Sequence, residues 1–168
     1  ENINLLLNAI HEKFNPYALN YCINEKLNDS TFDQTFISYK GNFEIQEELN
    51  GLKFNISPKS FFQTNPIQAE KLYQVALGFA EITENDVVYD LYCGTGTITC
   101  LAAAKAKKAI GVEIIDEAIK AAKVNAAINN INNVEFLVGD MKDVFNPEFY
   151  AKHGSPDIII TDPPRSGM

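Results

Sequence analysis

The stretch Asp-Leu-Tyr-Cys-Gly-Thr-Gly-Thr at residues 90–97 decides the fold class of this chain. It overlaps the end of an apolar run at 87–91 and opens a segment of small residues with helical spacing at 97–106. Glycines in such a turn let the backbone bend tightly and approach a ligand without a Cβ in the way. The amide ends of the helix that follows point toward the same space. These residues therefore predict a strand, a glycine-rich turn and a helix, with a ligand-binding site at the turn.

The residues after this turn continue the alternation of strand and helix. Three further apolar runs are expected to form strands, at 109–112, 134–138 and 157–161. A helix capped by Asp116 and running to about residue 128 is expected after the first of these, and the asparagine-rich segment 125–133 is predicted to be a loop. Short buried strands that alternate with helices are typical of a parallel, doubly wound sheet. The second part of the chain is therefore predicted to be of the α/β class.

The part of the chain before residue 60 has a different pattern. Asn50 and Gly51 separate two alternating runs, at 43–49 and 52–56. Both central residues of a type I′ turn need a positive φ, which Asn-Gly tolerates best, so a β-hairpin is predicted here. Further candidates are a short helix and two weaker strands, at 5–14, 17–26 and 35–40. We therefore expect a small antiparallel α+β lobe at 1–60, followed by a second domain at 61–168.

A helix at about 65–80 is predicted to precede the alternating segment. Asn65 can accept a hydrogen bond from the first amides of this helix, and Pro66 suits the first helical position because no amide hydrogen bond is lost there. The apolar face of the helix is expected to consist of residues at helical spacing, namely Leu72, Val75, Ala76 and Phe79.

Each expected strand after the first ends at an acidic residue. Glu113 closes the second strand, nineteen residues beyond Gly94, Asp140 follows the third strand, and Asp162 follows the fourth. Two prolines come directly after Asp162 and make this loop rigid. In an open parallel sheet the ligand binds outside the carboxyl ends of the strands, where a carboxylate can bind both ribose hydroxyls. The three acids and the glycine turn therefore predict a nucleoside-binding crevice.

Two kinds of nucleoside cofactor fit this crevice. A dinucleotide fingerprint has the pattern G-x-G-x-x-G, but Thr99 stands where the last glycine permits close helix packing beneath a pyrophosphate. S-adenosylmethionine carries no phosphate and needs only the turn, an acidic group at the ribose and a contact with adenine. The pattern therefore favours the methyl donor and leaves the dinucleotide as the alternative.

Length and composition exclude several other classes of protein. The chain has 168 residues, 46% of them hydrophobic, so it can bury an ordinary core and is not disordered. It has no uninterrupted apolar run of about 18 residues, which excludes a membrane span. Its net charge of −8 argues against a strong phosphate-binding surface in this part alone. Cys22, Cys93 and Cys100 form no Cys-x-x-Cys pair, so we expect no metal site, no disulfide scaffold and a cytoplasmic location.

Three motifs occur in a fixed order along the chain. They are Ser-Phe-Phe-Gln-Thr-Asn at 60–65, the glycine stretch at 90–97, and Asp-Pro-Pro-Arg-Ser-Gly at 162–167. Together they resemble the RNA uracil-C5 methyltransferase family, whose members make 5-methyluridine in 23S ribosomal RNA or transfer RNA. The resemblance runs from about residue 20 to the end of the chain. It implies a Rossmann-like class I S-adenosylmethionine-dependent methyltransferase fold with strand order 3-2-1-4 after a small central lobe, and an RNA substrate, with 23S ribosomal RNA favoured over transfer RNA.

The same resemblance assigns the cofactor contacts. The matching residues are Gln63, Tyr92, Thr97, Glu113, Asp140 and Asp162, and the glycine turn adds Gly94. In the family a cysteine thiolate adds to uracil C6 so that C5 can attack the methyl group, and a base then removes the C5 proton. That cysteine and a glutamate base follow later than the Asp-Pro-Pro-Arg motif, so both are expected beyond Met168. We therefore expect a fragment that binds the donor but has no catalytic residue of its own and does not methylate.

Two other functions stay open on the sequence. An amino-directed methyltransferase acting on adenine N6 would share the fold, but such enzymes often carry an aromatic residue where Arg165 stands. A nucleotide-binding module without chemistry would need only the crevice.

The expected sheet ends at its fourth strand, and we expect the unpaired edge of that strand to favour association of copies.

Overall fold

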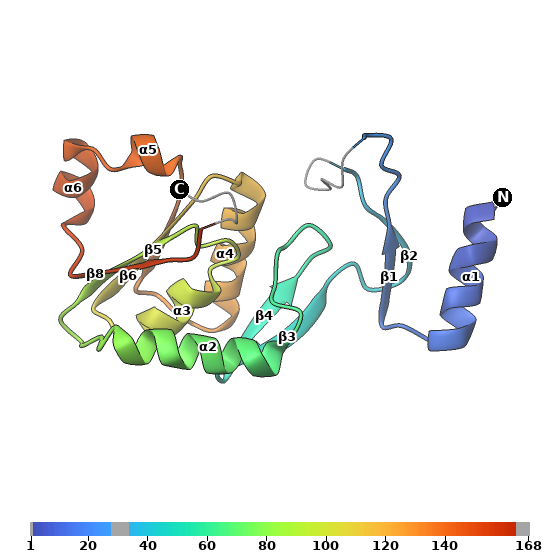
Figure 1. Ribbon diagram of the computed structural model, residues 1–168, viewed down its shortest axis with the longest axis horizontal. Coiled ribbons are helices and arrows are strands. Elements are labelled where there is room, and N and C mark those ends of the chain that lie inside the picture. The colour runs from blue at the N-terminus through green and yellow to red at the C-terminus, as the bar shows by residue number, and fades with distance from the viewer. Residues whose placement is uncertain (1, 28–33, 164–168) are drawn as a thin grey trace. The chain divides into compact units, whose positions relative to one another are not determined.

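The computed structural model describes residues 2–27 and 34–163, which divide into two compact units (Figure 1). One unit holds the described residues up to Glu47 together with Asn55–Ser60. The other holds Glu48–Phe54 and the described residues from Phe61 onward. Two separate domains with a boundary at residue 60 stay a prediction about how the chain folds.

The first unit contains a helix and short antiparallel strands. Helix α1 (Asn2–Phe14) is followed by β1 (Ala18–Tyr21), which pairs antiparallel with β2 (Ile37–Gly41). The Tyr39 hydroxyl on β2 donates a hydrogen bond of 2.8 Å to Asn8 Oδ1 on α1. The predicted helix and both weaker strands are therefore present, with the first strand shorter than predicted.

The predicted hairpin forms around Asn50 and Gly51. Its strands are β3 (Ile45–Leu49) and β4 (Leu52–Ile56). The φ angle is 51° at Asn50 and 79° at Gly51, so both turn residues are left-handed, as the sequence predicted. Leu49 and Phe54, on either side of the turn, are completely buried in the core of the second unit.

The second unit is built on a parallel sheet in the order β7-β6-β5-β8. In chain order its strands are β5 (Val87–Leu91), β6 (Lys108–Glu113), β7 (Val134–Val138) and β8 (Ile158–Thr161). The first of these, β5, pairs with both β6 and β8, so the predicted order 3-2-1-4 is confirmed. All pairs are parallel, which brings the carboxyl ends of the strands to one edge of the sheet.

Helices pack against both faces of this sheet (Figure 1). The described helices of the unit are α2 (Pro66–Phe79), α3 (Thr97–Ala103), α4 (Asp116–Ile128), α5 (Met141–Val144) and α6 (Pro147–His153). One apolar core joins α2, α3 and α4 to strand residues that include Val88 and Ala109. A second core joins Tyr89 and Ile110 to Phe149 on α6. Consecutive strand residues point to opposite faces, which is why Val88 and Tyr89 belong to different cores.

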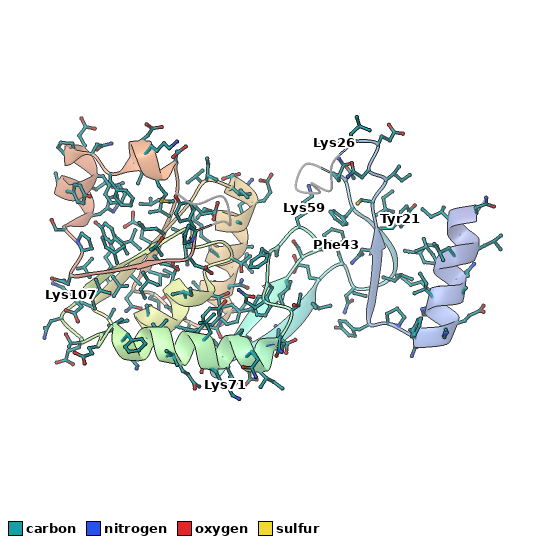
Figure 2. All side chains as sticks on the ribbon, viewed as in Figure 1. Tyr21, Lys26, Phe43, Lys59, Lys71 and Lys107 are labelled. Carbon is teal, nitrogen blue, oxygen red and sulfur yellow. The ribbon has the colours of Figure 1, made fainter. Side chains whose placement is uncertain are left out.

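The face that α2 buries differs from the predicted one. Tyr73 and Leu77 are buried, whereas Leu72 and Phe79 are 56% and 85% exposed. Figure 2 shows Lys71 projecting from α2 away from the sheet. Two overlapping apolar stripes on this helix both have helical spacing. Only the packing of the helix onto the sheet decides which of them is buried.

The segment around α4 also differs from the prediction. Asp116 is the first residue of the helix rather than its cap, and the N-cap is Ile115, which makes no side-chain hydrogen bond. The negative charge of Asp116 still suits this end of the helix dipole. Asn125, predicted to lie in a loop, belongs to α4 and is completely buried. Helices α5 and α6 were not predicted, because such short helices carry little periodicity.

Gly111 on β6 gives a test of how tightly the sheet, α3 and the glycine turn pack. A Cβ added there would come within 2.8 Å of Cys93 Sγ, Phe136 Cδ1 and Thr99 Oγ1. We expect Gly111→Ala to lower the free energy of unfolding by about 2 kcal/mol, because the added methyl group forces these neighbours apart. Gly78→Ala on α2 is the matched control, since a Cβ there meets nothing within 4 Å, and it should raise stability by about 0.5–1 kcal/mol. Urea denaturation measures both changes, and unaltered stability in Gly111→Ala would contradict this packing.

Candidate functional site

A pocket lies at the carboxyl end of β5, beside the glycine turn that follows this strand. The residues that line it come from the segment before α2, from α2, from the turn and the start of α3, and from the loop after β8. Five of the seven predicted site residues line this one pocket, namely Gln63, Tyr92, Gly94, Thr97 and Asp162. Pro164 and the rest of the Asp-Pro-Pro-Arg motif lie outside the described residues.

The glycine turn has a left-handed backbone at three positions. The φ angle is 63° at Tyr92, 52° at Gly94 and 78° at Gly96, which is the N-cap of α3. A tyrosine rarely adopts a positive φ, and residues in such conformations cluster at functional sites. The amide of Cys93 donates to Val112 O at 3.1 Å and anchors the turn to the neighbouring strand β6. The edge of the pocket is therefore attached to the sheet.

Glu113 ends β6 near the glycine turn but is not among the residues that line the pocket. Its side chain is buried, and its oxygens accept three backbone hydrogen bonds. Oε2 accepts from Gly94 N at 3.2 Å, and Oε1 accepts from Ile114 N at 2.8 Å and Ile115 N at 3.1 Å. A carboxylate oxygen can accept two hydrogen bonds, so Oε2 has capacity for one more donor.

Asp140 is the predicted site residue that the structure does not bring to the pocket or to the turn. It is the N-cap of α5, and its Oδ1 accepts a hydrogen bond of 2.9 Å from Lys142 N. It lines a different hollow, between the end of β7 and helices α5 and α6. Gly139 N donates to Glu113 O at 3.0 Å, so Asp140 directly follows a residue that is bound to the end of β6.

Seven further residues line the pocket, and two of them, Tyr73 and Asp90, are ionisable side chains that govern its polarity. Tyr73 is the first. It is buried on α2 and shares a hydrogen bond with Gln63. Burial raises the pKa of Tyr73, and the negative charges of Asp162 and Asp90 raise it further, so the phenol stays protonated. The sequence could have identified Tyr73 only if the other apolar stripe of α2 had been chosen as the buried one.

Asp90 is the second of these residues, and it is almost completely buried. Its Oδ2 accepts a hydrogen bond of 2.6 Å from the Thr99 hydroxyl, while its Oδ1 has no hydrogen-bond partner among the described residues. Burial raises the pKa of Asp90 to about 7, and the charges of Asp162 and Glu113 act in the same direction. The sequence contains Asp90 within the glycine motif but gives no sign of its burial.

The pocket is acidic. Asp90 and Asp162 line it, whereas no Lys, Arg or His is found among the described residues of its lining. Cys93 also lines it, but burial and then the charges of Asp90 and Glu113 raise the pKa of this thiol, which makes it a poor nucleophile. Such a pocket suits a ligand that carries positive charge and no phosphate.

The part of the chain that the structure describes contains neither a metal-binding cluster nor a membrane-spanning helix. Within 2–27 and 34–163, no three His, Cys, Asp or Glu residues gather closely enough to hold a metal ion. None of the helices in these ranges combines the length and the apolar character needed to cross a membrane.

The sheet and the turn define the fold class. A parallel sheet in this order, with a glycine turn after its first strand and an acid at the end of its second, is the class I S-adenosylmethionine-dependent methyltransferase fold. The fold class that the sequence implied is thus confirmed. The family model described as a methyltransferase domain matches residues 82–164 of the chain.

Relatives of known sequence carry a more specific description. A protein of Porphyromonas gingivalis named as an uncharacterized RNA methyltransferase is 49% identical over 97% of this chain. One of Bacteroides thetaiotaomicron with the same name is 51% identical over 90% of it. This chain covers 35% and 33% of these relatives, so it spans about a third of their length. Residues 82–164 thus match the model of a methyltransferase domain, and the chain has homologues named as RNA methyltransferases.

A solved structure with the same fold holds a product of the methyl donor. It is the tRNA (uracil-54, C5)-methyltransferase of Pyrococcus abyssi in complex with S-adenosyl-L-homocysteine, and it matches with a TM-score of 0.72. The two are 29% identical, and the match covers 94% of this chain and 37% of that one.

The raised pKa of Asp90 predicts how stability depends on pH. The folded state holds this proton up to about pH 7, whereas the unfolded chain releases it near its ordinary value of 3.8, so the group's contribution to stability falls as pH rises between these values. Asp90→Asn keeps an acceptor for the Thr99 hydroxyl and removes the charge. Its stability relative to the unaltered chain should therefore increase by about 3 kcal/mol between pH 5 and pH 8.

Urea denaturation at several pH values between 5 and 8 measures this difference. Asp143→Asn, on the exposed surface of α5, is the control and should show no such trend. A constant difference between Asp90→Asn and the unaltered chain across this range would contradict the assignment.

Proposed function

We propose that this chain binds S-adenosylmethionine in the pocket beside the glycine turn. We propose further that the whole protein is an RNA methyltransferase that forms 5-methyluridine, in 23S ribosomal RNA. The observation that carries the proposal is the acidic pocket at the carboxyl end of β5, in a fold shared with a methyltransferase that holds S-adenosyl-L-homocysteine. S-adenosylmethionine carries a cationic sulfonium and a cationic ammonium group, which the carboxylates of Asp90 and Asp162 attract.

In this proposal Glu113 binds the ribose of the donor, and its one free acceptor position, on Oε2, takes a ribose hydroxyl. Its three hydrogen bonds to backbone amides set the orientation of the carboxylate before any ligand arrives. The free acceptor capacity of Oε2 lies on the side of the glycine turn, because that oxygen already binds Gly94 N. A ribose placed over the turn can therefore donate to a carboxylate that needs no reorganisation.

The remaining predicted residues divide between the two ends of the donor. Gln63, Asp162 and Tyr73 are proposed to hold the methionine end, since all three line the pocket and Tyr73 interacts with each of the other two. Tyr92, Gly94 and Thr97 are proposed to border the adenosine from the turn and the start of α3. Asp140 is proposed to contact the adenine from the end of β7, on the resemblance alone.

The chemistry of uracil C5 requires a nucleophile that the described cysteines of the second unit do not supply. C5 is a poor nucleophile toward a sulfonium methyl group until a thiolate has added to C6. Burial raises the pKa of the Cys93 thiol and raises that of the Cys100 thiol to about 12, so neither is ready to attack at neutral pH. We propose that the nucleophilic cysteine and the glutamate base lie beyond Met168 in the whole protein, and that this chain by itself is inactive.

The partner and the location belong to the same proposal. RNA is the proposed substrate, and the choice of 23S ribosomal RNA over transfer RNA rests on the sequence motifs. With a net charge of −8 on this chain, other parts of the protein are proposed to supply most of the attraction for phosphate. A cytoplasmic location fits the three unpaired cysteines. Residues 1–60 are proposed as a central lobe and 61–168 as the front half of the methyltransferase domain.

Two alternatives are less well supported. A dinucleotide would bring two phosphates beside Asp90 and Asp162, with no cationic side chain among the described lining residues to offset them. An amino-directed methyltransferase shares the fold, but no described residue favours adenine N6 as its target. Arg165, which disfavours that activity on the sequence, lies outside the described residues.

Calorimetric titration with S-adenosylhomocysteine and with NAD tests the cofactor. We expect the chain to bind S-adenosylhomocysteine and not NAD, and Glu113→Ala to weaken S-adenosylhomocysteine binding at least tenfold, because the ribose loses a charged acceptor. Glu117→Ala removes an exposed carboxylate from the first turn of α4 and should leave the affinity unchanged. Full affinity in Glu113→Ala would refute the role given to this residue.

Mass spectrometry of RNA from a strain that lacks the gene tests the modified nucleoside. We expect the 5-methyluridine content of 23S ribosomal RNA to fall and to return when the gene is restored. Loss from transfer RNA instead would correct the substrate, and loss of an N6-methyladenosine would replace the proposed reaction.

A further inference from the structure

Two asparagines of the second unit do not line the pocket but bind segments that support it, namely the glycine turn and the hairpin. Asn125 lies in the last turn of α4, and Asn129 is the C-cap of that helix, four residues further on. Residues at this spacing share one helix face. Asn129 Nδ2 donates to Asn125 O at 2.8 Å and links the two. No residue of α4 lines the pocket, so these asparagines can affect it only through the groups that they bind.

Asn125 holds the glycine turn. Its side chain is completely buried, and its Nδ2 donates to Thr95 O at 3.1 Å. Thr95 is itself buried and lines the pocket. Burying an amide costs free energy unless it is hydrogen-bonded, so an apolar side chain would serve better here if filling space were the only role. The hydrogen bond to Thr95 O explains why an asparagine occupies this buried position.

Asn129 holds the hairpin. Lys53 N donates to Asn129 Oδ1 at 2.8 Å, and Asn129 Nδ2 donates to Lys53 O at 2.6 Å. One side-chain amide thus binds both backbone groups of a strand residue, as a neighbouring strand would. Phe54, the next residue, is completely buried, and its ring centroid lies 6.1 Å from that of Phe62. Phe62 lines the pocket and directly precedes Gln63. The hydrogen bonds between Asn129 and Lys53 are therefore linked to the pocket through the packed rings of Phe54 and Phe62.

The turn of the hairpin is bound by α2 as well. Asn50 N donates to Glu70 Oε1 at 2.6 Å, and Gln74 Nε2 donates to Asn50 Oδ1 at 2.7 Å. Tyr73, which lines the pocket, stands directly before Gln74 on this helix. The turn end of the hairpin is therefore held by α4 through Lys53 and by α2 through Asn50, and it supports the side of the pocket that carries Gln63 and Tyr73.

We infer that Asn125 and Asn129 are positioning residues for the methyl donor. Together they fix the position of the glycine turn relative to Phe62 and Gln63, which also line the pocket. The inference rests on the proposed S-adenosylmethionine site. Loosening the bond between Asn129 and the hairpin then weakens donor binding although Asn129 does not touch the pocket. By linkage, a bound donor tightens that bond in turn.

Asn129→Ala in the 168-residue chain is the principal test. It removes both hydrogen bonds to Lys53, and calorimetry should find S-adenosylhomocysteine bound about tenfold more weakly. The matched control is Asn132→Ala, because among the described residues the side chain of this exposed asparagine binds Asn130 O alone, at 3.3 Å. The control should bind as the unaltered chain does. Circular dichroism at the titration temperature establishes that each variant is folded.

A double-mutant cycle with Gln63→Ala separates positioning from a general loss of stability. If Asn129 acts by positioning Phe62 and Gln63, the fold-loss of affinity in the double variant should be smaller than the product of the fold-losses in the two single variants. A purely structural role for Asn129 predicts that the two losses multiply. Multiplying losses, or full affinity in Asn129→Ala, would overturn the inference.

Hydrogen exchange in the unaltered chain tests the same coupling without any substitution. Saturating S-adenosylhomocysteine should slow exchange of the Lys53 amide, which donates to Asn129, and unaltered exchange there would overturn the inference even if Asn129→Ala fails to fold. If the unaltered chain does not bind S-adenosylhomocysteine at all, the proposed function fails. Binding that is indifferent to Asn129 refutes only the positioning role.

Discussion

The anchoring of the glycine turn is the constraint on which the rest of the second unit depends. Hydrogen bonds from three places hold this turn, namely Cys93 N to Val112 O, Gly94 N to the Glu113 carboxylate, and the Asn125 side chain to Thr95 O. At Gly96 a Cβ would come within 2.8 Å of the Phe136 ring and 2.9 Å of Ala122 Cβ. The turn can therefore lie this close to β7 and α4 only with glycine at that position. A shift of either element would move the edge of the pocket.

The pocket places two acidic side chains, Asp90 and Asp162, at the edge of the apolar core. Asp90 is buried with one oxygen bound to Thr99 and the other without a partner among the described residues. In its ionised form a buried carboxylate of this kind raises the free energy of the unliganded state, which is why the pKa of Asp90 is raised. A cationic ligand would offset that cost, and this links the strain in the pocket to the donor that we propose.

Much of the architecture follows from local patterns, and the errors have a common cause. Asn50 and Gly51 specify their turn through backbone conformation alone, and the apolar runs at β5 to β8 specify strands because they are short and bounded by turn residues. The buried stripe of α2 and the helical state of Asn125 depend on contacts with residues far away in the sequence. Within the site, the acids at the strand ends could be predicted from their spacing. The burial of Asp90 and the position of Tyr73 on the buried face of α2 could not be predicted in this way.

The strands, helices α1 to α4, the glycine turn and the acids that follow the strands could all be placed from the sequence, because each depends on neighbouring residues and on the rules for connecting parallel strands. Only the packing of the second unit separates Asp140 from the pocket, buries Tyr73 on α2, and joins the turn end of the hairpin to α2 and to Asn129 at the end of α4. These outcomes depend on which surfaces bury each other. That choice is made by packing across the whole unit, and no local pattern encodes it.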